Sequence, residues 1–251
     1  MNERYIHLGS GVFLDHLGAG PEQAFIEGRI RHRFMDALYL PSQTHLLEAN
    51  AIRVINKWRD EQLVVYPLLH RDRVRRIGVA VGRVFCAPRV LEIGCGGYPI
   101  AAEVGASAYV GLDIDPAAAQ AATALGVRVV TTPLEIFREA TEVDIVFSLF
   151  AMQFAIDDDT LNLIELIPNT AIAFFNLPTR DNALAETRVR QIESRGLATS
   201  ILDLTAAGPK DRLVLAGKSE AALVMAKARR AAQMQACAEW PLVGSEAIWQ
   251  D

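Results

Sequence analysis

A glycine-rich segment directly after an apolar run constrains this chain more than any other feature. Residues 89–93 are mostly apolar, and Gly94 and Gly96 follow them just before a predicted helix. Glycine has no Cβ, so backbone N–H groups and a ligand can come close where a strand gives way to a helix. Asp113 ends the next apolar run, nineteen positions after Gly94. An acid about 20 residues after such a loop is placed to bind ribose hydroxyls. The two features together predict a site for an adenine nucleoside.

Two common nucleotide-binding loops do not fit this segment. A dinucleotide loop has the pattern G-x-G-x-x-G, whose third glycine lets helix and strand pack closely, but Pro99 stands at that position. A P-loop needs a lysine followed by serine or threonine after its second glycine, and no such lysine follows here. The sequence therefore argues against NAD, a flavin or a P-loop nucleotide as the ligand.

The segment resembles motif I of the class I S-adenosylmethionine-dependent methyltransferases, E/D-x-G-x-G-x-G. Glu92, Gly94 and Gly96 match that motif, whereas Tyr98 stands where the family usually has its last glycine. Three further segments resemble later motifs in the family's order, namely residues 111–116, 143–150 and 171–176. The resemblance covers residues 86–218 and implies S-adenosylmethionine as the cofactor.

The resemblance also implies which residues surround that cofactor. Gly94 and Gly96 would lie under its methionine part, and Asp113 would bind its ribose. Leu134 would pack on the adenine, although Thr131-Thr132-Pro133 replaces the acid usual in the family. The other residues expected as cofactor contacts or at the border of the methyl-transfer centre are Glu92, Cys95, Tyr98, Ile114, Ser148, Leu149 and Phe150.

Some of these residues have a second interpretation. Phe150 is equally well placed to be a core residue, and Cys95 is expected to be a small packing residue rather than a nucleophile, because no base accompanies it. Asn176 begins a segment similar to the N-P-P-Y signature of amino-group methyltransferases. That signature follows the fourth strand, whereas Asn176 is expected at the end of the fifth. The sequence thus identifies no catalytic base.

The pattern after residue 85 predicts an α/β fold. Apolar strands are expected near residues 89–93, 108–112, 127–131, 143–149 and 170–176, with helices between them, as in a parallel sheet covered on both faces. A helix near 181–195 precedes two strands whose short link permits only a hairpin; these strands are expected at 199–205 and 212–217. We therefore expect a Rossmann-like doubly wound sheet, mostly parallel, with a C-terminal antiparallel hairpin.

A helical lid is expected in front of this core. Pro21 would begin one helix, whose apolar residues recur at helical spacing; they are Phe25, Ile26, Ile30, Phe34 and Leu38. Further helices are expected near 42–58 and 71–85. The predicted domains are a lid or substrate cap at 1–85, a cofactor-binding core at 86–218, and a C-terminal helix and tail at 219–251.

Composition excludes several classes of partner. The chain has 251 residues and a net charge of −5, whereas nucleic-acid-binding proteins usually carry a basic surface. The sequence contains no run of about 18 apolar residues, so it predicts no membrane span. The start of the chain does not resemble a signal peptide. The three cysteines lack metal-ligand spacing. We expect a cytoplasmic protein without a metal that acts on a small molecule; the sequence leaves the oligomeric state open.

The expected reaction is transfer of the methyl group of S-adenosylmethionine to a small-molecule acceptor. Two alternatives stay open. The Tyr98-Pro99 loop is similar to that of nicotianamine synthases and azetidine-forming enzymes, which attack the aminobutyryl chain of the cofactor and release methylthioadenosine. The other alternative is a non-catalytic partner subunit that keeps the fold.

Overall fold

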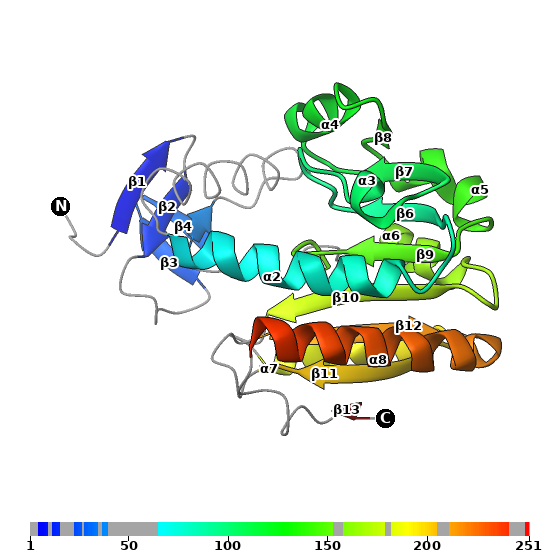
Figure 1. Cartoon of the computed structure of the whole chain (residues 1–251). Coiled ribbons are helices and arrows are strands. Elements are labelled where there is room, and N and C mark those ends of the chain that lie inside the picture. Colours follow the sequence, from blue (N-terminus) through cyan, green and yellow to red (C-terminus); the bar gives the residue numbers. More distant parts are fainter. Residues whose placement is uncertain are drawn as a thin grey trace. The chain divides into compact units, whose positions relative to one another are not determined.

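A computed structural model gives the fold of the chain (Figure 1). It describes residues 5–9, 12–15, 23–26, 28–34, 37–39, 65–152, 158–178, 182–204, 211–240 and 249–250. The chain divides into two compact units, Met1–Leu68 and Leu69–Asp251, and each unit contains a sheet of its own.

The first unit is built from short antiparallel strands. They are β1 (Tyr5–Gly9), β2 (Val12–Asp15), β3 (Gln23–Ile26), β4 (Arg29–Phe34) and β5 (Ala37–Tyr39), in the order β1-β2-β5-β4-β3. The prediction of a helix between Pro21 and Leu38 is therefore wrong. The helix expected near 42–58 lies outside the described residues.

The spacing of apolar residues in this segment fits a hairpin as well as a helix. Gly28 has a φ of +75°, a left-handed conformation that glycine adopts without strain, and it lies in the turn between β3 and β4. Phe25 then pairs with Ile30 across the two strands. Ala24 and Ile26 are buried while Phe25 between them is exposed, which is the alternation of a strand.

The second unit contains an eight-stranded sheet in the order β13-β11-β12-β10-β9-β6-β7-β8. Its strands are β6 (Arg89–Ile93), β7 (Ala108–Leu112), β8 (Arg128–Val130), β9 (Ile145–Ser148), β10 (Ile172–Pro178), β11 (Ala198–Asp203), β12 (Asp211–Gly217) and β13 (Trp249–Gln250). The strands from β8 to β10 pair in parallel, and β12 is antiparallel to both β10 and β11. The predicted sheet, parallel with a C-terminal antiparallel hairpin, is confirmed.

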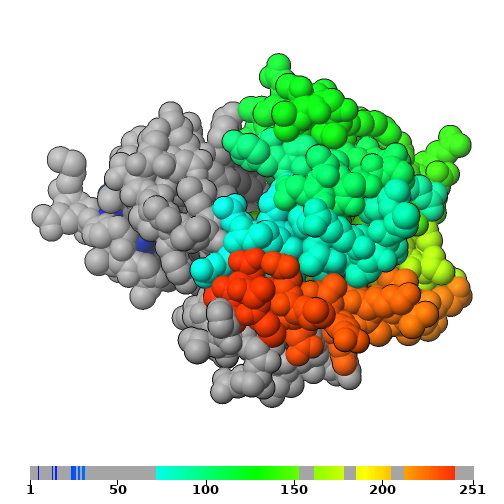
Figure 2. Space-filling view, viewed as in Figure 1, coloured from blue at the N-terminus to red at the C-terminus, as the bar shows by residue number. Residues whose placement is uncertain are grey.

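Helices cover this sheet on both faces, as expected for a doubly wound fold. They are α2 (Val65–Gly82), α3 (Ala101–Val104), α4 (Pro116–Thr123), α5 (Phe137–Ala140), α6 (Asp158–Glu165), α7 (Asn182–Glu193) and α8 (Ala222–Glu239), with short 3-10 turns η1 (Pro133–Ile136) and η3 (Ser219–Ala221). Helices α2 and α8 lie on the same face, which Figure 2 shows in cyan and red.

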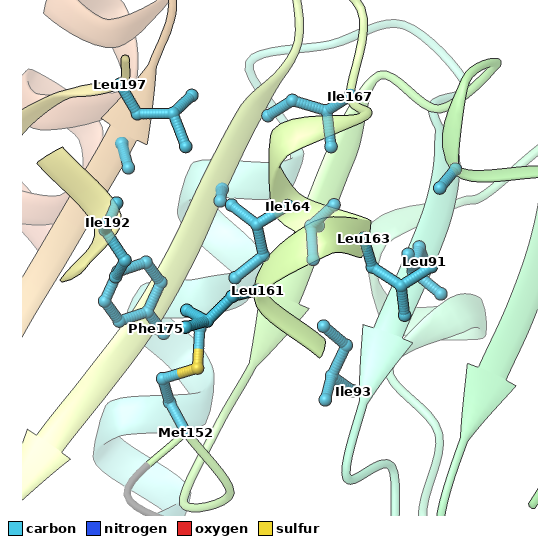
Figure 3. Close-up of a cluster of buried hydrophobic side chains, with 14 of the residues drawn as sticks. Leu91, Ile93, Met152, Leu161, Leu163, Ile164, Ile167, Phe175, Ile192 and Leu197 are labelled. Atoms are coloured by element: carbon cyan, nitrogen blue, oxygen red, sulfur yellow. The ribbon is translucent and has the colours of Figure 1, made fainter. Parts of the chain in front are cut away.

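The strands bury both of their faces in two apolar clusters. Phe147 and Phe174 belong to the cluster that includes residues of α2, α3 and α8. Leu91 and Phe175 belong to the opposite cluster, where Leu161 and Ile164 of α6 lie between them (Figure 3). Such continuous burial explains why these strands are apolar throughout rather than alternating.

Helix α2 packs as part of the second unit. Its residues Val74, Ile77 and Val81 are fully buried in the cluster of β9 and β10. Arg76 donates two hydrogen bonds to the carboxylate of Glu239 in α8, at 2.6 and 2.7 Å. The helix predicted near 71–85 is thus confirmed, and it covers the sheet of the core.

Candidate functional site

The glycine loop after β6 has the conformation that its glycines permit. Gly94 and Gly96 have φ values of +72° and +59°, a region that residues with a Cβ adopt at a cost. A Cβ on Gly94 would lie 2.1 Å from the Cβ of Ala151. The loop after β6 and the turn after β9 are therefore packed against each other without room for a side chain.

Two carboxylates hold this loop, one at each end. Asp113, directly after β7, accepts the N–H of Gly96 on Oδ2 at 2.7 Å. Glu92, inside β6, accepts the N–H of Ile100 on Oε2 at 2.8 Å. Residues 96–100 are consequently fixed to the ends of β6 and β7, which pair in parallel.

Glu92 lies beneath the loop and is buried. Its Oε2 also accepts the hydroxyl of Tyr109 at 2.6 Å. Burial raises the pKa of Glu92 to about 7, although the hydrogen bonds from Tyr109 and Ile100 oppose this shift. Glu92 thus supports the loop from inside the protein, and the cofactor contact expected for it stays a prediction.

Cys95 is also buried inside the loop. Burial, together with the nearby carboxylates of Glu92 and Asp113, raises the pKa of its thiol to about 12. Because the thiolate is the nucleophilic form, this environment favours the packing role predicted for Cys95. A Cβ on Gly111 of β7 would lie 2.8 Å from the Cys95 sulfur, which shows how closely β7 packs on the loop.

Asp113 supports the loop and can still accept further hydrogen bonds. Its second oxygen, Oδ1, accepts the N–H of Asp115 at 2.9 Å. Burial raises the pKa of Asp113, and the hydrogen bonds from Asp115 and Gly96 oppose that rise. A carboxylate oxygen has two lone pairs, so each oxygen can accept another hydrogen bond, such as one from a ribose hydroxyl.

Three exposed apolar side chains follow the ends of neighbouring parallel strands. Tyr98 follows β6 and is 82% exposed, Ile114 follows β7 and is 36% exposed, and Leu134 follows β8 and is 66% exposed. The carboxyl ends of parallel strands lie at one edge of a sheet, which is where open α/β sheets bind ligands. The structure therefore places these predicted site residues along the same edge as Asp113.

The turn after β9 is fixed by Asn176, a residue not predicted to belong to the site. Phe150 has a φ of +62°, and its N–H donates to Oδ1 of Asn176 at 2.5 Å. Asn176 is fully buried near the end of β10. A single asparagine forms no recognisable sequence pattern. Its contact with Phe150 becomes visible only when β9 and β10 are paired in the folded sheet.

Within the described part of the chain, two polar atoms near this turn are buried without a hydrogen-bond partner, the Ser148 hydroxyl and the Nδ2 of Asn176. Such groups usually have partners. Asn176 Oδ1 accepts the Phe150 N–H, so the atom of Asn176 that lacks a partner is its Nδ2, a hydrogen-bond donor. Leu149 packs with the cluster of α2 and Phe174. Residues 148–150 precede Ala151, which contacts the glycine loop at Gly94; their place at the border of the methyl-transfer centre stays a prediction.

No group of three or more His, Cys, Asp or Glu residues in the described part of the chain is arranged to hold a metal ion. No described helix is both long enough and apolar enough to cross a membrane.

Comparisons with known proteins identify the fold. Neither a protein-family model nor a curated protein matches the chain. A TehB-like S-adenosylmethionine-dependent methyltransferase from Corynebacterium glutamicum is similar over 70% of this chain and 100% of its own, with 14% identity and a TM-score of 0.50. A possible histamine N-methyltransferase from Thermotoga maritima is similar over 69% of this chain and 99% of its own, with 12% identity and a TM-score of 0.46. The chain therefore has the fold of the S-adenosylmethionine-dependent methyltransferases.

Proposed function

We propose that this protein transfers the methyl group of S-adenosylmethionine to a small-molecule acceptor. The observation that carries the proposal is the glycine loop held between Glu92 and Asp113, with spare acceptor capacity on the Asp113 carboxylate. This arrangement fits a nucleoside at the carboxyl edge of the sheet. Solved structures with the same fold are described as S-adenosylmethionine-dependent methyltransferases.

Each end of the proposed cofactor site has its own residues. Asp113 would accept the ribose hydroxyls, and the exposed side chains of Ile114 and Leu134 would pack on the adenine. The backbone of Gly94 and Gly96 would lie against the methionine part, where the absence of a Cβ allows close approach. Tyr98 and the turn at Phe150 are the remaining parts of the proposed cofactor site.

The cofactor supplies an electrophilic methyl carbon on its sulfonium when bound. The task of the chain is then to align the acceptor with the bond to that carbon and to exclude water. Asn176 fixes the backbone of Phe150 beside the loop, so this turn borders the proposed transfer centre. The protonated thiol of Cys95 takes no part in the transfer.

The nature of the acceptor is inferred from charge. The net charge of −5 disfavours a nucleic-acid acceptor, and this supports a small molecule. The first unit is proposed as the substrate cap. The three free cysteines fit a reducing compartment, and we place the protein in the cytoplasm on that basis.

Product analysis tests the proposal. The protein is incubated with S-adenosylmethionine and panels of small amines, phenols and carboxylic acids, and the products are identified by mass spectrometry. The expected products are S-adenosylhomocysteine and a methylated acceptor. Release of methylthioadenosine would instead identify attack on the aminobutyryl chain. Cofactor binding without turnover across all panels would contradict catalysis and favour a partner subunit.

A further inference from the structure

Tyr98 is exposed although the loop that carries it is firmly held. The loop is fixed at Gly96 by Asp113 and at Ile100 by Glu92, through hydrogen bonds of 2.7 and 2.8 Å. The Tyr98 side chain between these two points is 82% exposed. Pro99 restricts its own φ and disfavours a helical conformation at Tyr98. A large aromatic ring is thus presented to solvent on a backbone with little freedom.

We propose that Tyr98 packs on the amino-acid chain of the bound cofactor and selects ligands that carry this chain. The inference rests on the proposed function. A ring on a fixed backbone can cover a ligand at a small cost in conformational entropy. The amino-acid chain of the ligand carries an ammonium group in both S-adenosylmethionine and S-adenosylhomocysteine, and the face of an aromatic ring attracts cations.

The order of the strands assigns Tyr98 to this end of the ligand. Leu134 follows β8, Asp113 follows β7 and Tyr98 belongs to the loop after β6, and the strands lie in the order β6-β7-β8. With the ribose at Asp113 and the adenine toward Leu134, the rest of the ligand extends toward β6. Tyr98 and Leu134 therefore lie on opposite sides of the ribose position.

Two ligands distinguish a contact between Tyr98 and the amino-acid chain of the ligand from a general effect of Tyr98 on binding. S-adenosylhomocysteine carries the amino-acid chain, whereas methylthioadenosine has the same nucleoside and sulfur but lacks it. Calorimetry measures both dissociation constants for the unmodified protein, Tyr98→Ala and Tyr98→Phe. Tyr98→Ala should weaken S-adenosylhomocysteine binding about tenfold and leave methylthioadenosine binding within about twofold. Tyr98→Phe keeps the ring and should bind both ligands as the unmodified protein does.

Two control variants complete the experiment. Leu134→Ala should weaken both ligands by the same factor, because both carry the adenine. Leu223→Ala removes another exposed side chain, on α8, and should change neither. Equal losses for the two ligands in Tyr98→Ala, or no loss for either, would overturn the assignment. Failure of the unmodified protein to bind S-adenosylhomocysteine would instead contradict the proposed function.

Discussion

The buried carboxyl of Glu92 makes the stability of this protein depend on pH. Burial raises its pKa from 4.5 to about 7 in the folded state. Between these two values the unfolded chain has released a proton that the folded protein still holds, so the free energy of unfolding falls as pH rises. The expected fall is about 3 kcal/mol in total, and it levels off once pH exceeds the folded pKa.

Glu92→Gln removes this titration while keeping an oxygen that can accept from Tyr109 and Ile100. Urea unfolding gives the free energy of unfolding of both proteins between about pH 5 and about pH 8, around the pKa range of about 4.5 to 7. The difference between the two proteins at each pH is the contribution of the Glu92 titration. The unmodified protein should lose stability relative to the variant as pH rises. Parallel curves would show that Glu92 does not titrate in this range.

Asp113 is expected to contribute more to ligand binding than any neutral side chain at its position. Asp113→Asn keeps the shape but removes the charge and one acceptor oxygen. Charge-assisted hydrogen bonds are worth roughly 1.5–3 kcal/mol, so S-adenosylhomocysteine should bind about tenfold more weakly or worse.

Asp144→Asn is the matched control for calorimetry with Asp113→Asn. Asp144 also accepts a backbone N–H, that of Arg89 at 2.8 Å, but it lies where β6 begins, away from the proposed site. It should leave the affinity unchanged. If Asp113→Asn binds S-adenosylhomocysteine as tightly as the control does, Asp113 is not the ribose ligand.

At the scale of elements, the contact between the glycine loop and the turn after β9 can be tested with two glycines. Gly94 and Gly126 have φ values of +72° and +84°. An added Cβ meets Ala151 at 2.1 Å in the first case and nothing within 4 Å in the second. Both alanine variants are destabilised by about 1–2 kcal/mol because alanine is strained in the left-handed conformation. Only Gly94→Ala must also displace the turn after β9.

Thermal unfolding and calorimetry distinguish the two variants. Gly94→Ala should lower the melting temperature more than Gly126→Ala does, and it should lose S-adenosylhomocysteine binding. Gly126→Ala should bind normally. Equal behaviour of the two variants would mean that the loop and the turn after β9 move independently.

The elements of the core were predictable because their ends carry local signals. Glycine follows β6 at Gly94, an acid follows β7 at Asp113, and both strands are continuous apolar runs. The short link between β11 and β12 likewise requires an antiparallel pair. Residues 89–93 and 108–112 therefore form strands with the predicted bounds.

Other features depend on contacts that a local pattern does not encode. The residues from Phe25 to Leu38 satisfy helical spacing, yet the left-handed turn at Gly28 and one-sided burial give a hairpin. Asn176 contributes through its bond to Phe150, which exists only because β9 and β10 pair in register. The burial of Glu92, and hence its loop-supporting role, likewise depends on packing around Tyr109.

At the scale of the whole molecule, the proposed lid gives a prediction for hydrogen exchange. We expect residues 1–60 to exchange more slowly when S-adenosylhomocysteine and an accepted acceptor are both bound, because closure over the site would exclude water from the transfer. The β11–β12 hairpin serves as an internal reference. Complete protection of residues 1–60 without ligand would identify a fixed cap, and specificity would then have another origin.

The choice of ligand is the central claim for this protein. Pro99 occupies the position where a dinucleotide loop has glycine, and the fold is that of the S-adenosylmethionine-dependent methyltransferases. Isothermal titration calorimetry with S-adenosylhomocysteine and with NAD tests the claim directly. We predict saturable binding of one S-adenosylhomocysteine per chain and no heat of binding with NAD. Tight binding of NAD, with no response to S-adenosylhomocysteine, would contradict it.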